Sequence, residues 1–229
     1  MRTHVRSIAA ALGAGMLVAA CGGSATLETP TATPTTTATA TAGGTTASAG
    51  AWTVTDKSKA TIRVREQLVG VSLPSDAVLT ATGAKGSFEL NSDGTFESGS
   101  KITFDLTTLS SDESQRDNFI KQDTLQVRQF PTAAFVPTKT SGLVLPLAAS
   151  GTFTFTLTGN VTIRGKTKAV TFDVTAKRDG SDLTATATAN PSWKFGDFGM
   201  TAPSVPLRVL SVTDEIRATI DIVATGPKA

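Results

Sequence analysis

The most constraining feature of this sequence is the alternation of apolar and polar residues in several of its segments. It is clearest in ATIRVREQL at residues 60–68, SKITFDL at 100–106, TFTFTLTGNVTI at 152–163 and EIRATIDIV at 215–223. Successive side chains of a strand point to opposite faces, so each segment predicts a strand with one apolar and one polar face. That pattern is typical of antiparallel sheets. Many such strands, with no regular alternation of strands and helices, predict a barrel or a sandwich.

Turn residues between these segments predict how neighbouring strands pair. In IRGKTK, a two-residue Gly165-Lys166 loop suits a type II′ hairpin, which places Gly159 opposite Phe172. In NSDGTF, a three-residue loop that ends in glycine predicts a turn with a bulge, which places Leu90 opposite Phe96. Both pairings bring large apolar residues to one face of the sheet.

A third hairpin predicts a strand whose inner face carries only small residues. KRDGSD forms an Asp179-Gly180 turn, which places Phe172 opposite Ala187 and Val174 opposite Ala185. Two interpretations remain open for such a strand. Either large side chains such as Phe172 fill the space beside it, or the barrel encloses an empty lumen that holds a ligand.

One segment departs from the strand pattern. LSSDESQRDNFIKQDT predicts a helix over residues 111–124, in which Ser110 caps the first turn and Glu113 reaches back to it. Phe119 and Ile120 give this helix a narrow apolar face, which suits a lid better than a core helix.

The first turn of this helix is acidic, with Asp112, Glu113 and Asp117 close together. These residues lack the spacing and the glycine of a calcium loop, and we interpret them as a solvated turn that suits the helix dipole. No metal site is therefore expected.

The N-terminal region predicts export and anchoring. Residues 1–20 combine a basic start with a short apolar run, as in a signal peptide, and VAAC ends at Cys21, the only cysteine. This ending resembles a bacterial lipobox, which implies a lipidated Cys21 and a membrane-anchored lipoprotein in the bacterial cell envelope, outside the cytoplasm. An ordinary secretory signal with a chance cysteine is the alternative. Residues 21–50 are rich in Thr, Ala and Pro and predict a disordered tether, and 51–226 predict the folded domain.

Charge and missing residue types exclude several functions. Of 21 basic and 19 acidic residues, Arg2 and Arg6 lie in the predicted signal peptide, so the remainder carries no net charge, which argues against nucleic acid as a partner. The only histidine is His4. The mature chain would therefore lack the histidine that Ser-His and Cys-His nucleophiles and the usual zinc sites require, and we expect no enzyme activity.

Four motifs in order resemble the YceI-like polyisoprenoid-binding proteins. They are an Arg116-Asp117 helix, the strand entry Phe130-Pro131-Thr132, the hairpin from Gly159 to Lys168, and FGDFGM at 195–200, with VTDEIRATIDIVA as a last strand. The resemblance covers residues 52–224. It implies an extended lipocalin-like barrel of eight antiparallel strands that encloses a long isoprenoid chain, with one short helix near the opening. The chain departs from the family pattern at Asn118 and at Asp123-Thr124-Leu125.

These considerations predict a lumen that binds one long apolar lipid, such as a polyisoprenoid, without a further cofactor. The alternative is a structural or interaction module, not an enzyme, with a barrel filled by side chains. The predicted lumen residues are Ile62, Val64, Phe88, Phe104, Phe119, Phe153, Phe155, Val170, Phe172, Val174, Ala185, Ala187, Trp193, Phe195, Phe198 and Met200.

Overall fold

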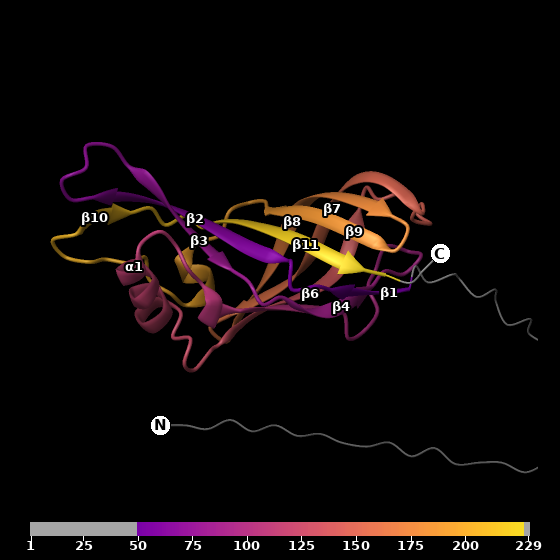
Figure 1. The fold of residues 1–229 in the computed structure, drawn as a ribbon, viewed down its shortest axis with the longest axis horizontal. Coiled ribbons are helices and arrows are strands. Elements are labelled where there is room, and N and C mark those ends of the chain that lie inside the picture. Colours follow the sequence, from indigo (N-terminus) through magenta and orange to yellow (C-terminus); the bar gives the residue numbers. More distant parts are fainter. Residues whose placement is uncertain (1–49, 227–229) are drawn as a thin grey trace, which may run out of the picture. The chain divides into compact units, whose positions relative to one another are not determined.

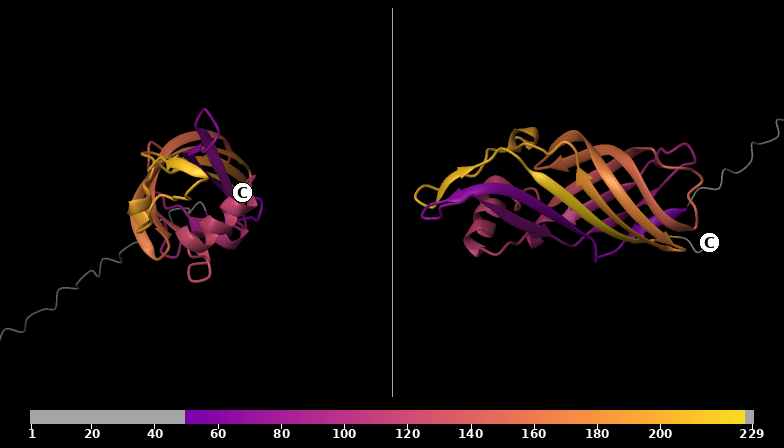
Figure 2. Two further views of the ribbon diagram at one scale, coloured as in Figure 1. Left: turned by 90° about the vertical axis from the view of Figure 1, so that its left-hand side faces the viewer. Right: turned by 90° about the horizontal axis from the view of Figure 1, so that it is seen from above.

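The computed structural model describes residues 50–226. The predicted signal peptide, Cys21 and all but the last residue of the predicted tether lie outside the described residues. Within 50–226, strands wind around a common axis and one short helical segment lies at one end (Figures 1 and 2). No helix in this part of the chain is long and apolar enough to cross a membrane.

The strands agree with the alternating segments of the sequence. Their bounds are β1 Ala51–Val54, β2 Lys59–Leu68, β3 Ser75–Ala81, β4 Lys85–Glu89, β5 Lys101–Asp105, β6 Thr132–Ser141, β7 Ser150–Ile163, β8 Lys166–Asp179, β9 Asp182–Ala189, β10 Val209–Val212 and β11 Arg217–Thr225. The helical elements are η1 Leu106–Thr108, α1 Ser114–Phe119, the π-helical η2 Ile120–Thr124 and η3 Phe195–Phe198.

Eight antiparallel strands close into a ring, as predicted. Their order is β1-β4-β5-β6-β7-β8-β9-β11, and the ring closes because β1 also pairs with β11, with Val54 opposite Ala224. At one end β2 continues the wall beside β11, and β3 and β10 pair with β2. Closure pairs the strand edges that an open sheet would leave exposed.

The predicted register of the β7–β8 hairpin was wrong by two residues. The loop is Arg164-Gly165, with φ of 50° and 69°, so Leu157 rather than Gly159 lies opposite Phe172. Positive φ at both loop positions is what a type I′ turn requires, and an arginine in that conformation is not evident from a sequence pattern. A shift of two leaves every residue on its predicted face.

The predicted β8–β9 register was also wrong by two residues, whereas the hairpin in NSDGTF was predicted correctly. The β8–β9 loop is Gly180-Ser181, so Val174 lies opposite Ala187 and Phe172 opposite Ala189. The alanines still share the inner face with the large residues of β8. Leu90 pairs with Phe96 as predicted.

The predicted start of the helix was also wrong. The helix begins at Ser114, where the Glu113 carboxylate accepts the Gln115 backbone N–H at 3.1 Å. Ser110 does not cap it, because its backbone pairs with Thr80 of β3. The helical turns end at Thr124, as predicted.

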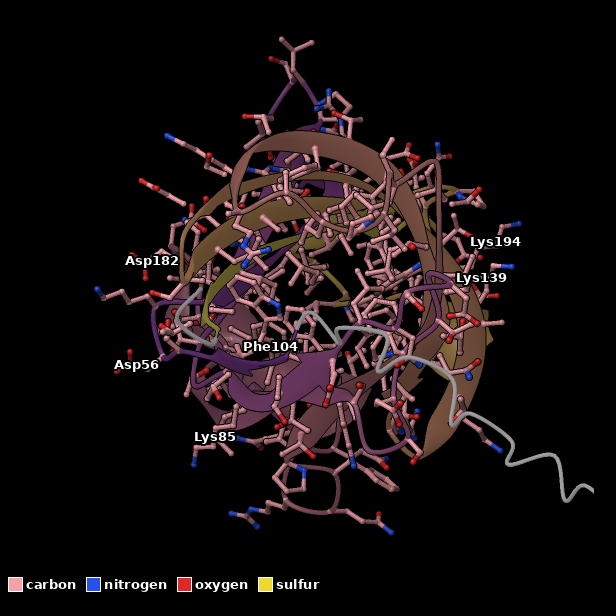
Figure 3. All side chains as sticks on the ribbon, turned by 90° about the vertical axis from the view of Figure 1, so that its right-hand side faces the viewer. Asp56, Lys85, Phe104, Lys139, Asp182 and Lys194 are labelled. Carbon is pink, nitrogen blue, oxygen red and sulfur yellow. The ribbon has the colours of Figure 1, made fainter. Side chains whose placement is uncertain are left out.

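The ring of strands separates outward-pointing charged side chains from an apolar interior. Viewed from the end where β1 lies, several charged side chains point outward, whereas Phe104 lies among the side chains of the interior (Figure 3). The labelled charged residues are Asp56, Lys85, Lys139, Asp182 and Lys194. Near this end, Arg178 of β8 lies 5.1 Å from the ring centre of Trp52, and both side chains are buried.

Candidate ligand-binding cavity

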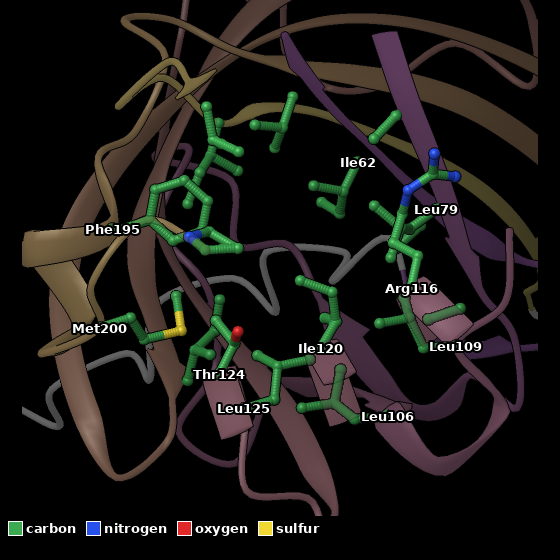
Figure 4. A pocket seen from close by; sticks show the side chains of 18 of the residues that line it. Ile62, Leu79, Leu106, Leu109, Arg116, Ile120, Thr124, Leu125, Phe195 and Met200 are labelled. Carbon is green, nitrogen blue, oxygen red and sulfur yellow. The ribbon is translucent and has the colours of Figure 1, made fainter. Parts of the chain in front are cut away.

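The barrel contains a cavity of about 810 Å³, on the side of the interior nearest α1. Its wall is predominantly aliphatic and aromatic, and Phe195 and Met200 lie across it from Leu79 and Leu109 (Figure 4). This volume lies within the range of roughly 300–1,000 Å³ that is usual for ligand pockets in proteins. The cavity can therefore hold a small organic molecule or part of a longer one.

Most of the predicted lumen residues border this cavity or a smaller one. Ile62, Val64, Phe104, Phe119, Phe172, Ala187, Trp193, Phe195 and Met200 line the large cavity. A second cavity of about 100 Å³ is lined by Phe88, Phe153, Phe155, Val174, Ala185 and Ala187 among others. Whether these side chains contact a ligand stays a prediction.

Two of the predicted residues line neither cavity. Phe198 is fully buried and packs edge-on against Trp193, with ring centres 5.6 Å apart. Val170 is buried opposite Gly159 in the β7–β8 ladder. Both lie on an inner face and pack against other side chains, and their contact with a ligand stays a prediction.

Ala187 is a small residue of β9 that borders open space. It borders both cavities, whereas Phe172 lies beside Ala189 and makes edge-to-face contacts with Phe135 and Trp193. Large side chains thus fill the space near Ala189, while the space beside Ala187 remains open. Filled and open space thus occur along the same strand, and a ligand in the open part stays a prediction.

A constriction separates the two cavities. Both are bordered by Ile102, Phe135, Leu157, Ala187 and Ile222. The Phe135 ring lies on Gly159 of the next strand, where a Cβ atom would come within 2.4 Å of the ring. Glycine at this position therefore lets the aromatic ring lie flat across the barrel wall.

The sequence analysis missed part of the cavity wall. Leu79 and Ala81 of β3 line the large cavity, together with Leu109 after η1. The signal was present, because Ala77, Leu79 and Ala81 alternate with other residues on one face. The segment 203–212 also contributes: Pro203, Val205, Leu207, Val209 and Val212 line the cavity, and the first four stand at alternate positions that were passed over.

A buried ion pair borders the cavity beside α1. Arg116 Nη2 donates to Glu66 Oε1 at 2.7 Å, and its Nη1 donates to Asp112 Oδ1 at 2.6 Å. The side chains of Arg116 and Glu66 are only 17% and 8% exposed. Burial alone would lower the pKa of Arg116, but the hydrogen bond with Asp112 and the charge of Glu66 raise it above its usual value. Glu66 was missed, although it falls on the inner face of β2 in the alternation.

A second ion pair joins β8 to η3. Lys168 donates to Asp197, whose carboxylate also accepts the Lys194 backbone N–H at 2.8 Å. The hydrogen bond from Lys168 holds the pKa of Asp197 below its usual value. Both ion pairs neutralise charges near the apolar wall. Within residues 50–226, no group of three His, Cys, Asp or Glu side chains is placed to hold a metal ion.

Comparison with known proteins gives one family. The profile of the YceI-like domain matches residues 52–224. A UPF0312 protein of Pseudomonas putida strain W619 is 34% identical over 124 residues, or 49% of this chain. The match spans 59% of the length of that curated relative.

Solved structures share the fold. A polyisoprenoid binding domain from Saccharophagus degradans, implicated in plant cell wall breakdown, has a TM-score of 0.59 at 10% identity, over 78% of this chain and 99% of that one. BcnA from Burkholderia cenocepacia has a TM-score of 0.52 at 18% identity, over 74% of this chain and 97% of its own. At such identities the likeness concerns the fold alone.

Proposed function

The chain belongs to the YceI-like domain family, and on that premise we propose that its barrel binds one long apolar lipid, most plausibly a polyisoprenoid. The observation that carries the proposal is the large cavity, whose wall is mostly apolar and whose buried charges, Arg116 and Glu66, form an ion pair. Such a wall suits a hydrocarbon chain, because it offers contact area without leaving buried charges unpaired. The description of the Saccharophagus degradans domain as polyisoprenoid-binding supports this choice of lipid.

The energetics favour a long ligand over a short one. Each methylene group moved out of water contributes about 0.8 kcal/mol. Association costs roughly 4–15 kcal/mol in lost freedom of motion. A short apolar molecule gains little beyond that cost, whereas about twenty buried carbons contribute about 16 kcal/mol and exceed it.

The proposal extends to where the protein works. We place it in the bacterial cell envelope as a lipoprotein, anchored through Cys21 and a tether formed by residues 22–50. There it would bind, store or carry the lipid and would not transform it. Export and lipidation are supported by the sequence of residues 1–21, which lie outside the described residues.

The first test asks whether the native protein contains lipid. Protein purified from bacterial membranes is extracted with organic solvent, and the extract is analysed by mass spectrometry. We expect about one long-chain apolar lipid per protein, in addition to any lipid attached to Cys21. Protein that carries no such lipid, and that also fails to bind added solanesol, a linear polyprenol, would overturn the proposal.

The second test fills the cavity. Ala187→Phe places a ring in the space that borders both cavities. We expect at least about a tenfold loss of solanesol binding, since the ring takes space that the ligand's methylene groups need. The fold should remain stable, because the ring enters open space. Thr188→Phe adds a ring of the same size to the exposed face of the same strand and should bind solanesol normally. If Ala187→Phe unfolds the protein, the interior is a packed core, and the alternative of a structural or interaction module is favoured.

A further inference from the structure

Large apolar side chains are exposed together at one end of the barrel. Val69, Val71 and Leu73 lie in the connection between β2 and β3. Leu207 precedes β10, and Leu210 lies within it. The two segments are neighbours, because the Val69 N–H donates to the Arg208 carbonyl at 2.9 Å. They project at the end where α1 lies, visible at the left of Figure 1 and in the right-hand view of Figure 2. We call these five residues the apolar tip.

The exposure of the apolar tip is costly in water. Leu73, Leu207 and Leu210 are 74%, 93% and 66% exposed. Single exposed leucines are common on protein surfaces, but a group on adjoining loops is not. Leu207 also has a φ of 66°, a conformation that glycine or asparagine adopts far more easily than leucine. A backbone outlier that holds a leucine in water suggests a function for the exposed side chain.

The two segments that form the apolar tip carry one charge, which is positive, while Asp112 and Glu113 before α1 border the large cavity. Residues 67–75 and 201–213 contain no aspartate or glutamate, and Arg208 is their only charged residue. Arg208 is exposed. An apolar group with a flanking cation matches the outer layer of a bilayer, where hydrocarbon lies just below anionic phosphates.

The apolar tip is continuous with the cavity. Val69, Val71 and Leu207 line the large cavity as well as facing outward, and Arg208 lines it too. We propose that the apolar tip inserts into the outer layer of a lipid bilayer and places the cavity mouth against the membrane, so that an apolar chain passes between them without crossing water. The inference rests on the proposed function for what the contact serves, but not for the contact itself.

Flotation with vesicles tests the contact. The chain starting at Gly22 contains every residue that the structure describes and lacks Cys21, so it binds vesicles without an acyl anchor. It should float with vesicles of phosphatidylcholine containing phosphatidylglycerol. The double variant Leu73→Asp, Leu210→Asp changes two exposed leucines that do not line the large cavity. It should lower the ratio of bound to free protein at least about tenfold, because aspartate loses the transfer free energy of an inserted leucine.

Val144 supplies a matched control. It is 80% exposed and lies in the β6–β7 connection. The Leu147 and Ala148 carbonyls of this connection accept hydrogen bonds from Arg178, which lies beside Trp52 of β1. Val144 is therefore at the other end of the barrel. Val144→Asp should leave flotation unchanged. Equal loss in both cases, or no flotation of the unaltered chain, would overturn the proposal; in the second case a protein partner is the remaining occupant.

A fluorescent probe gives an independent readout. Because the chain starting at Gly22 has no cysteine, Leu207→Cys and Val144→Cys each carry a single polarity-sensitive label. Vesicles should shift the emission to the blue at position 207 and not at 144. The double aspartate variant should still bind solanesol delivered in detergent. Loss of solanesol binding in every form of the chain, with flotation retained, would end the proposed function and leave the membrane contact standing.

Discussion

At the scale of single residues, Arg178 carries the clearest consequence for stability. It is buried over Trp52, and its guanidinium donates to the carbonyls of Gly180, Leu147 and Ala148 at 2.9–3.3 Å. Among the described residues it has no carboxylate partner within ion-pair distance. These carbonyls and the indole face therefore replace the water that a buried guanidinium loses.

We expect Arg178→Ala to lower the free energy of unfolding by about 2–3 kcal/mol, because carbonyls that it satisfied lose their donor and Trp52 loses its cover. Denaturant unfolding of the chain starting at Gly22 measures the change. Lys177→Ala removes the exposed cation next to it on the same strand and should change stability by no more than about 0.5 kcal/mol. Equal effects of the two variants would mean that the buried position has no special role.

Single residues were predictable where they obeyed an alternation. Phe104 and Phe172 were assigned to the interior because their strands alternate, and both line the cavity. Glu66 obeys the same alternation but was passed over, since a carboxylate on an inner face is expected only if its partner is known. That partner, Arg116, lies fifty positions further along the chain.

At the scale of elements, faces were predictable and registers were not. Turn chemistry in IRGKTK and KRDGSD permits two adjacent choices of loop, and both keep the apolar residues inside. Packing between strands is equally absent from a local pattern, for example where the Phe135 ring of β6 contacts Gly159 of β7. No local pattern reports this contact, because the two residues come from different strands.

The contact between Phe135 and Gly159 predicts a steric penalty. A Cβ at position 159 would lie 2.4 Å from the Phe135 ring and 2.6 Å from the Val136 carbonyl oxygen. We expect Gly159→Ala to cost about 1–3 kcal/mol of stability, because β6 and β7 must move apart or the ring must leave its position. Thermal and denaturant unfolding measure this cost.

Gly196 is the matched control, since a Cβ there meets nothing within 4 Å. Gly196→Ala should be close to neutral. In a double-mutant cycle, Phe135→Ala should relieve part of the Gly159→Ala penalty, while the clash with the Val136 carbonyl remains. Additive effects would show that the ring does not require the glycine.

At the scale of the whole molecule, the sequence predicted a closed barrel of eight strands but not the construction of its mouth. The alternating segments left a barrel or a sandwich open, and the closed barrel of eight strands was implied by the family resemblance. The mouth is built from β3, α1, the β2–β3 connection and residues 203–212, and the last two are mostly connections outside the strands. Such loops take their positions from the strands that they join, so local sequence says little about where they lie.

The predicted anchor and the apolar tip are two separate means of membrane attachment. The described chain begins next to β1, and β1 lies at the end of the barrel opposite β10 and α1 (Figure 1). A lipidated Cys21 would hold the protein to a membrane through the tether, whereas the apolar tip would make a weaker, reversible contact at the mouth. Since the chain after residue 20 carries no net charge, a polybasic patch does not add a third attachment.

The two attachments predict opposite phenotypes in full-length protein expressed in bacteria. Cys21→Ser should move the protein from the membrane fraction to the aqueous fraction, because a few inserted side chains hold far less tightly than acyl chains. The double variant Leu73→Asp, Leu210→Asp should stay in the membrane fraction and exchange solanesol with vesicles more slowly, since its cavity mouth no longer rests on the bilayer. Fractionation with mass spectrometry of the mature N-terminus checks the first expectation. A mature chain that keeps residues 1–20, or a Cys21→Ser protein that stays on the membrane, would contradict the anchor and leave the apolar tip as the attachment to be explained.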